Sequence, residues 1–272
     1  MSKRTNLSII GCGAIGTATG KFLDKRFPEK VSLKYLFDTD HRKEEKLKNC
    51  LKNLKPRHAE SLSVLFKNSD LVIETASTKA VRPVLEKACR YRKDIIILSS
   101  GGLMNETVLL NKLKKKGVKV YIPSGAVCGI DGILAFAREG IKKLTLLTSK
   151  PPKGLKETAY LERRKIDLEK LTKPLLVFKG PPQKAVKYFP KNINVSSILF
   201  LASQFKKMTV AIKVVPGQSK NIHEIILESS IGKIEVKVEN LPSKKNPKTS
   251  ALAIASVKAL IAKLFSSLKI GT

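Results

Sequence analysis

A glycine triplet directly after a short apolar run constrains this chain more than any other feature. Residues 7–10 (Leu-Ser-Ile-Ile) suit a buried parallel strand, and Gly11, Gly13 and Gly16 follow with the spacing G-x-G-x-x-G. The first glycine permits a tight turn, the second lets a phosphate approach the backbone, and the third lets the next helix pack on the strand. The helix N-terminus then faces the phosphates. The stretch, with Ala14 and Ile15 inside it, predicts a dinucleotide-binding turn.

The residues that follow favour the same interpretation over a strand-turn-helix without a ligand. Residues 31–37 predict a second strand that ends at Asp38. An acidic residue about 20 positions beyond the glycines accepts hydrogen bonds from the adenosine ribose. A carboxylate there favours NAD, but Arg42, four residues later, can accommodate the 2′-phosphate of NADP. We therefore expect NAD as cofactor, with some use of NADP.

Strand-like and helix-like segments alternate up to about residue 122. Further strands are predicted at residues 71–75, 95–98 and 118–122, and helices at residues 13–26, 42–54, 81–91 and 106–116. This alternation predicts an α/β fold, a Rossmann domain with a doubly wound parallel sheet over residues 1–122. Ligands bind at the carboxyl ends of such strands, so we expect residues 74–78 to lie near the nicotinamide half of the cofactor.

The second half of the chain has a different pattern. Strand-like runs lie at residues 144–148, 175–178, 208–214, 224–228 and 234–238, and the last two alternate polar with apolar residues. Such alternation predicts antiparallel neighbours in a second, α+β domain, over residues 123–245. Helices are predicted at residues 194–205 and 247–268, the latter with Asn246 as N-cap and Pro247 at its first position. We expect residues 246–272 to pack back toward the first domain.

Composition excludes several classes of protein. No apolar run approaches the ~18 residues of a membrane span, and a strand begins too close to Met1 for a signal peptide, so we expect a cytoplasmic protein without a membrane partner. The formal net charge of +31 comes from scattered lysines without interleaved aromatics, which argues against specific nucleic-acid binding and leaves non-specific adhesion at low salt. The four cysteines are far apart, so we expect no metal site and no disulfide framework.

Several stretches together resemble the L-aspartate dehydrogenase family along nearly the whole chain. They are residues 11–16, 123–132, 189–195, 221–225 and 246–250. The resemblance implies a Rossmann domain, a second domain with a mixed sheet that helps form a homodimer, and NAD(P)-dependent oxidative deamination of L-aspartate. The product is iminoaspartate, which hydrolysis converts to oxaloacetate and ammonia. Iminoaspartate that escapes hydrolysis would feed NAD biosynthesis. Ala126 and Asn194 match the family's cofactor-contacting positions, and His223 matches its catalytic histidine.

His223 is the histidine best placed for chemistry. It lies at the start of a predicted strand of the second domain, where it could face a cleft, and a neutral imidazole can exchange protons at working pH. Beside Ile222 and Ile225, spacing alone favours a structural residue. The resemblance makes it the group that activates water against the imine and protonates the departing ammonia after hydride transfer to the cofactor.

The two substrate carboxylates need hydrogen-bond donors. Lys248, Thr249 and Ser250 stand at the predicted start of the last helix, where anions are favoured, although an ordinary capped helix start is the alternative. Ser124 is a further candidate if the small-residue segment 123–132 lines a cleft. The alternative is that this segment is a plain interdomain loop. The lysine-rich tract from Lys153 to Lys173 has no assigned role.

Two other functions fit parts of the sequence. In a semialdehyde-type dehydrogenase, Cys128 would attack an aldehyde, but a nucleophilic cysteine needs a basic partner, for which only His223 is a candidate. A non-catalytic nucleotide-sensing or basic nucleic-acid-binding Rossmann protein is supported by the charge alone.

Overall fold

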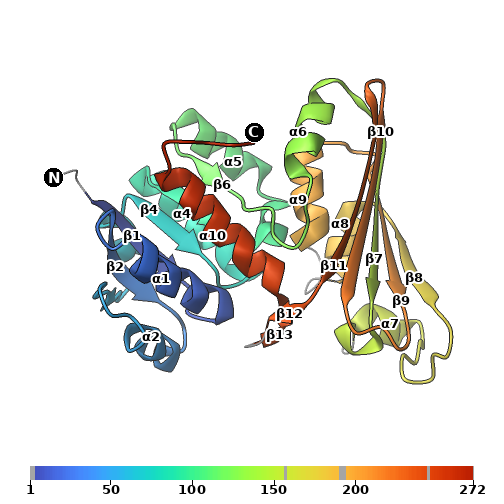
Figure 1. Cartoon of the computed structure of the whole chain (residues 1–272), viewed down its shortest axis with the longest axis horizontal. Helices are drawn as coiled ribbons and strands as arrows, with labels where there is room; N and C mark the ends of the chain where they lie inside the picture. The colour runs from blue at the N-terminus through green and yellow to red at the C-terminus, as the bar shows by residue number, and fades with distance from the viewer. Residues whose placement is uncertain (1–3, 156–157, 190–193, 244–245, 272) are drawn as a thin grey trace. The chain divides into compact units, whose positions relative to one another are not determined.

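The computed structural model describes residues 4–155, 158–189, 194–243 and 246–271, without the side chains of residues 246–248. The chain divides into two compact units (Figure 1). Unit 1 comprises Met1–Pro123 and Ile254–Lys269, and unit 2 comprises Ser124–Ala253 and Ile270–Thr272. No helix in the described ranges combines the length and the apolar character needed to cross a membrane.

Unit 1 is built on a six-stranded sheet in which every strand pair is parallel. Its strands are β1 (Thr5–Ile10), β2 (Val31–Phe37), β3 (Arg57–His58), β4 (Leu71–Glu74), β5 (Asp94–Ile97) and β6 (Val120–Tyr121). The order β3-β2-β1-β4-β5-β6 confirms the predicted doubly wound sheet. Strands β2 and β3 lie on one side of β1, and β4, β5 and β6 lie on its other side. The strand order therefore reverses between β1 and β4, and ligands bind beside such a switch point.

Helices connect these strands and complete the core of unit 1. They are α1 (Ala14–Arg26), α2 (His41–Lys48), α3 (Leu62–Lys67), α4 (Thr78–Tyr91), the 3-10 turn η1 (Ser100–Leu103) and α5 (Thr107–Lys115). The last helix, α10 (Ala251–Phe265), adds Val257 and Ile261, both fully buried, to the same core as Leu7 and Leu23. Burial of such apolar side chains contributes about 1.5–3 kcal/mol each.

The predicted helix at residues 42–54 ends earlier, at Lys48. The cause is the carboxylate of Asp24, which accepts hydrogen bonds from the backbone N–H groups of Lys52, Asn53 and Leu54. These bonds replace the helical ones and hold the segment after α2 against α1.

Unit 2 contains a five-stranded mixed sheet in the order β11-β10-β7-β9-β8. Its strands are β7 (Ile141–Lys150), β8 (Leu175–Gly180), β9 (Thr209–Val214), β10 (Asn221–Ser229) and β11 (Gly232–Asn240). The pair β7–β9 is parallel and the other pairs are antiparallel, as the resemblance implied. The remaining elements are α6 (Ile130–Arg138), η2 (Pro152–Gly154), α7 (Ala159–Arg163), α8 (Pro182–Tyr188), α9 (Asn194–Ser203), β12 (Pro242–Ser243) and β13 (Asn246–Ser250).

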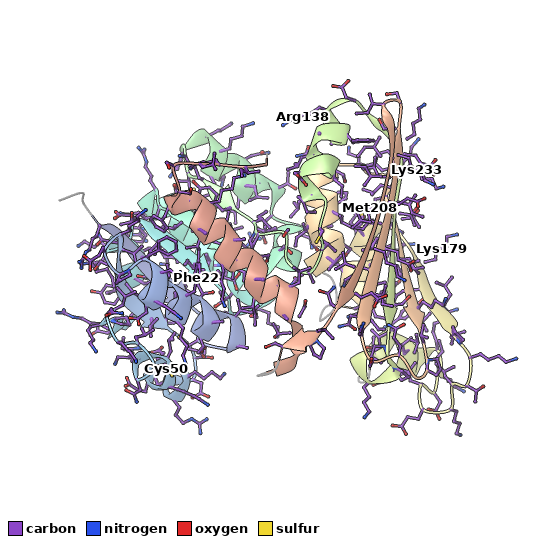
Figure 2. The ribbon with its side chains drawn as sticks, viewed as in Figure 1. Phe22, Cys50, Arg138, Lys179, Met208 and Lys233 are labelled. Carbon is purple, nitrogen blue, oxygen red and sulfur yellow. The ribbon has the colours of Figure 1, made fainter. Side chains whose placement is uncertain are left out.

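The two faces of this mixed sheet differ. Along β10, His223, Ile225 and Leu227 are buried, whereas the intervening residues are partly exposed. Figure 1 shows α6, α8 and α9 on one face of the sheet. Lys179 and Lys233, labelled in Figure 2, lie on the opposite face. The alternation predicted for the last two strands therefore separates an inner face under helices from an outer face of mixed apolar and charged residues.

The prediction of a helix starting at residue 247 is wrong. Residues 246–250 form β13, which pairs with β12, and α10 begins at Ala251. Proline fits an extended edge strand as well as a first helical turn, so Pro247 does not distinguish the two. The helix cap is Ser250, whose Oγ accepts a hydrogen bond of 3.1 Å from the backbone N–H of Leu252. The side chain of Asn246 and residues 190–193, which belong to the stretch 189–195 of the resemblance, lie outside the described part.

Candidate active site

The glycine turn between β1 and α1 has the geometry of a phosphate cradle. Gly11 has a left-handed φ of +89°, and a Cβ on it would lie 2.6 Å from the backbone of Ala76. A Cβ on Gly16 would lie 1.9 Å from the carbonyl oxygen of Gly11. A Cβ on Gly13, in contrast, would meet no heavy atom within 4 Å. The first and third glycines are thus required by packing, and the second leaves open space at the N-terminus of α1 that fits a pyrophosphate.

Asp38 ties the end of β2 to this turn. Its Oδ2 accepts a hydrogen bond of 2.7 Å from the backbone N–H of Cys12, and its Oδ1 accepts one of 2.9 Å from that of Asp40. Each carboxylate oxygen has a second lone pair that a ribose hydroxyl can use. Arg42 makes a bidentate pair with Asp40, with bonds of 3.0 and 3.3 Å. The guanidinium predicted to accommodate a 2′-phosphate is therefore engaged with a neighbouring carboxylate.

Glu74 organises the carboxyl ends of β4 and β5, and sequence reasoning assigned it no such role. It is fully buried, and burial raises the pKa of its carboxyl group. Its oxygens accept hydrogen bonds from the backbone N–H groups of Ala76, Ser77 and Ser99 and from Ser99 Oγ. The sequence signal that could have identified Glu74 is its position at the end of the apolar run Leu-Val-Ile. These bonds fix the loops that follow both strands.

His223 lies on the inner face of the mixed sheet and is 5% exposed. It stands opposite Thr148 of β7, and its Nδ1 shares a hydrogen bond of 3.0 Å with Thr148 Oγ1. Burial, and second the positive charge of Lys150, lower the pKa of His223 to about 3. The imidazole is therefore neutral at working pH.

Lys150 is a buried cation on the His223 face of the sheet that the sequence reasoning did not single out. It is buried at the end of β7, two residues beyond Thr148 on the same face of the strand, and burial lowers its pKa to about 8. It stays charged at neutral pH, which puts an ammonium group beside a neutral imidazole. A lysine that closes the otherwise uncharged run at residues 144–149 was the signal that could have identified it.

A hydrogen-bond network joins two of the predicted site segments within unit 2. Asn240 Nδ2 donates to the carbonyl oxygen of Ala126 at 2.9 Å, and Ser250 Oγ donates to Asn240 Oδ1 at 2.7 Å. Asn240 is 3% exposed and was not predicted as a site residue. It pairs with Asn221 across β10 and β11, at the end of the sheet where His223 lies.

The other candidates lie near these groups to different degrees. A Cβ on Gly125 would approach Ile198 of α9 within 2.9 Å, so the loop holding Ser124 and Ala126 packs on the helix that Asn194 begins. Asn194 itself is exposed. Thr249 is partly buried in β13, and the side chain of Lys248 lies outside the described part.

The cysteines give no support to a thiol mechanism. Burial raises the pKa of the Cys12 thiol to about 12, so it stays protonated in the glycine turn. Cys128 is exposed, and the hydrogen bond described above joins His223 to Thr148 instead.

The parallel sheet, the glycine cradle and the buried imidazole define a dinucleotide-dependent dehydrogenase. Residues 11–123 match the family model "Homoserine dehydrogenase, NAD binding domain", and residues 131–264 match "Aspartate dehydrogenase, C-terminal". Curated L-aspartate dehydrogenases of Methanosarcina barkeri and Methanocaldococcus jannaschii are 39% and 38% identical, and each alignment covers 98% of this chain and 99% of the relative. The aspartate dehydrogenase structure from Thermotoga maritima matches with a TM-score of 0.73 at 25% identity, over 99% of this chain and 100% of that one.

The chain belongs to the L-aspartate dehydrogenase family. This confirms the resemblance found in the sequence, and it makes unit 1 an NAD(P)-binding domain.

Proposed function

We propose that this chain catalyses the NAD(P)-dependent oxidative deamination of L-aspartate. The observation that carries this proposal is the pair of buried groups, His223 and Lys150, on one sheet face of a chain that matches L-aspartate dehydrogenases over its whole length. The bound cofactor would accept the hydride from the substrate Cα. Water would convert the resulting iminoaspartate to oxaloacetate and ammonia.

The residues of unit 1 bind and orient the cofactor in this proposal. The open space at Gly13 and the N–H groups of Ala14 and Ile15 at the start of α1 receive the pyrophosphate. Asp38 accepts hydrogen bonds from the adenosine ribose, and its charge disfavours a 2′-phosphate. In unit 2, Ala126 and Asn194 take the nicotinamide end, as their positions in the family pattern indicate. We propose NAD as the preferred cofactor and NADP as a second one.

His223 is the proposed acid-base group. When its Nδ1–H donates to Thr148 Oγ1, its Nε2 keeps a lone pair that can accept a proton from water attacking the imine carbon. The same nitrogen then protonates the departing amine. A bound dianionic substrate would offset the charge of Lys150, which lowers the pKa of the imidazole in the free enzyme. Substrate binding thus makes His223 a stronger base.

The substrate carboxylates require cationic or N–H partners. Lys150 is the proposed anchor for one of them, because its charge is buried and lies on the His223 face of the sheet. Ser124, Lys248 and Thr249 are proposed for the other. Ser250 already bonds to Asn240 and caps α10, so we propose that it shapes the site through the first turn of that helix.

The direct test is turnover. Purified protein is incubated with L-aspartate and either NAD or NADP at alkaline pH, and the absorbance of the reduced cofactor is followed. The proposal expects reduction with both, faster with NAD, and none with D-aspartate. His223→Ala should still bind NAD but lose turnover, and Cys128→Ser should keep the parent rate. If aspartate gives no turnover while nucleic acid binds tightly at physiological salt, a nucleotide-sensing or nucleic-acid-binding protein is the correct assignment.

We further propose a homodimer that forms through the outer face of the mixed sheet. Leu147 and Ile226 lie near the middle of this face, and Lys237 of β11 stands opposite Glu224 of β10, so alternating charges flank an apolar centre. Light scattering should give twice the chain mass for the parent and the chain mass for Ile226→Lys. A parent that is monomeric at micromolar concentration would refute the dimer.

Two further predictions concern the cellular role. We propose that the enzyme works in the cytoplasm, where its free cysteines would stay reduced. We also propose that its iminoaspartate supplies NAD biosynthesis, which predicts that deleting the gene makes growth depend on an added precursor of the nicotinamide ring.

A further inference from the structure

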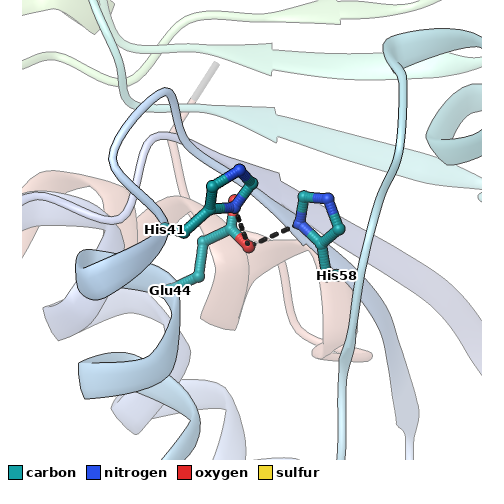
Figure 3. A group of neighbouring side chains, drawn as sticks. All are labelled: His41, Glu44 and His58. Carbon is teal, nitrogen blue, oxygen red and sulfur yellow. Dashed lines mark hydrogen bonds and ion pairs between the residues drawn. The ribbon is translucent and has the colours of Figure 1, made fainter.

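Three side chains beside the end of β2 bring together the donor atoms that transition-metal ions prefer. His41 and Glu44 lie three residues apart on α2, and His58 lies on β3, paired with Leu36 of β2. Glu44 Oε2 is 2.7 Å from His58 Nδ1 and 3.7 Å from His41 Nδ1 (Figure 3). All three ligand atoms lie within 4.8 Å of one another, and the described ranges contain no second such group. The cluster thus offers two imidazole nitrogens and one carboxylate oxygen.

The burial of the three side chains suits a site that an ion can enter. Glu44 is almost fully buried, and its Oε1 accepts a hydrogen bond of 2.6 Å from the backbone N–H of Asp38. This bond fixes the carboxylate so that Oε2 faces the two imidazoles. The side chains of His41 and His58 are 70% and 37% exposed. A rigid carboxylate ligand therefore lies at the base of a site whose two imidazole ligands reach solvent.

The separations between the ligand atoms are close to those of a tetrahedral zinc site. Zn–N and Zn–O bonds of about 2.0–2.2 Å put the ligand atoms of a tetrahedron roughly 3.4 Å apart. The two separations from Glu44 Oε2 bracket this value, and turning the exposed His41 ring about its side-chain bonds brings its nitrogen closer. Three protein ligands leave a fourth position for water, as in open zinc sites.

We propose that His41, Glu44 and His58 bind a divalent transition-metal ion of the zinc class. The sequence analysis expected no metal site because the cysteines are widely spaced, but the proposed site contains no cysteine. His58 is brought to the other two ligands by the pairing of β2 and β3. The ion would also hold Glu44, whose second oxygen supports the backbone of Asp38 at the adenosine end of the cofactor site. Metal binding does not depend on aspartate turnover, so this proposal stands or falls separately from the proposed function.

The test uses the full chain, freed of metal with a chelator, and titrates it with Co²⁺ while visible absorption is recorded. The proposal expects one saturable, tetrahedral-type Co²⁺ spectrum per chain, which Zn²⁺ abolishes by competition. His41→Ala should weaken Co²⁺ binding by more than about 100-fold, because loss of an outer-shell partner alone weakens metal sites 10–100-fold. His41 is exposed, so this variant is expected to fold. Glu45→Gln, at the exposed neighbouring position of α2, is the matched control and should bind as the parent does.

A second readout guards against a change in folding. Zn²⁺ should raise the melting temperature of the parent and of Glu45→Gln but not that of His41→Ala or His58→Ala. Absence of saturable Co²⁺ binding to the parent would overturn the proposal and leave a hydrogen bond between His58 and Glu44 with His41 beside it. Equal affinity in the parent, His41→Ala and His58→Ala would also overturn it, because the ion would then bind elsewhere.

Discussion

The glycine turn allows a prediction in which two similar substitutions have different effects. A methyl group on Gly16 would lie 1.9 Å from the carbonyl oxygen of Gly11 and 2.7 Å from Thr75 Oγ1. The turn and α1 would have to separate by about 1 Å, and such overpacking costs about 1–3 kcal/mol or more. The gain in helix propensity, about 1 kcal/mol, offsets only part of this cost. Gly16→Ala should therefore unfold at a lower temperature even without cofactor.

Gly13→Ala should leave the folded protein intact. Its φ of −70° is open to any residue, and a Cβ there meets no heavy atom within 4 Å. The free energy of unfolding should stay within about 0.5 kcal/mol of the parent value. The methyl group would, however, occupy the space assigned to the pyrophosphate. Loss of one charge-assisted hydrogen bond, worth about 1.5–3 kcal/mol, weakens NAD binding about 10- to 150-fold.

Thermal unfolding without cofactor and isothermal titration with NAD separate the two effects. The expected result is an unchanged melting temperature with weak NAD binding for Gly13→Ala, and losses in both measurements for Gly16→Ala. Parent-like NAD affinity in Gly13→Ala would show that the open space does not receive the cofactor. A large drop in its melting temperature would show that the space is needed for packing.

Three further predictions concern charged and polar side chains. The pKa of His223 is about 3 in the folded chain and about 6.5 in the unfolded chain, so the stability of the folded protein falls as the pH falls from about 6.5 to 3. Urea titrations over this pH range should show a smaller loss of stability for His223→Asn than for the parent. Equal losses would contradict the argument that burial lowers the pKa of His223. Lys150→Met should raise the KM for aspartate about tenfold or more, and an unchanged KM would show that Lys150 does not bind the substrate. The parent should gain stability between about pH 8 and 10.5, because the unfolded chain there keeps a proton on Lys150 that the folded chain has released. Urea titrations should show no such gain for Lys150→Met. Asp38→Asn should lower kcat/KM with NAD and raise the ratio of kcat/KM with NADP to kcat/KM with NAD about tenfold, because one negative charge beside the ribose is removed. Steady-state kinetics with both cofactors measure this ratio. An unchanged ratio would show that another residue determines the cofactor preference.

Local signals predict unit 1 well. The turn at Gly11 to Gly16 and the strand that ends at Asp38 are contiguous patterns, and each depends on a few residues with fixed backbone requirements. The error at residue 247 has a similar local origin, since Pro247 suits both an edge strand and a first helical turn, and the pairing of β13 with β12 decides between them. Local patterns therefore fix an element only where the alternatives differ in local energy.

Contacts between distant strands are harder to predict. Thr148 and His223 are 75 residues apart in the chain and meet through the register of β7 and β10. That register also puts Lys150 near the imidazole, so its effect on the pKa of His223 cannot be deduced from either segment alone. Asn240 is similar, because its side chain joins Ala126 to Ser250 across more than a hundred residues of sequence.

The place of α10 in the core of unit 1 has a consequence for how the protein is made. The ribosome delivers the glycine turn first, but Val257 and Ile261 complete the core around it, and the carbonyl oxygen of Phe265 accepts a hydrogen bond of 3.0 Å from Lys30 Nζ. Phe265 also lies 5.4 Å from Phe27, centroid to centroid. The segment with the glycine turn therefore remains partly exposed until residues 254–265 have also been synthesised. We expect nascent chains stalled before residue 254 to be sensitive to protease in unit 1 and to need chaperones during translation.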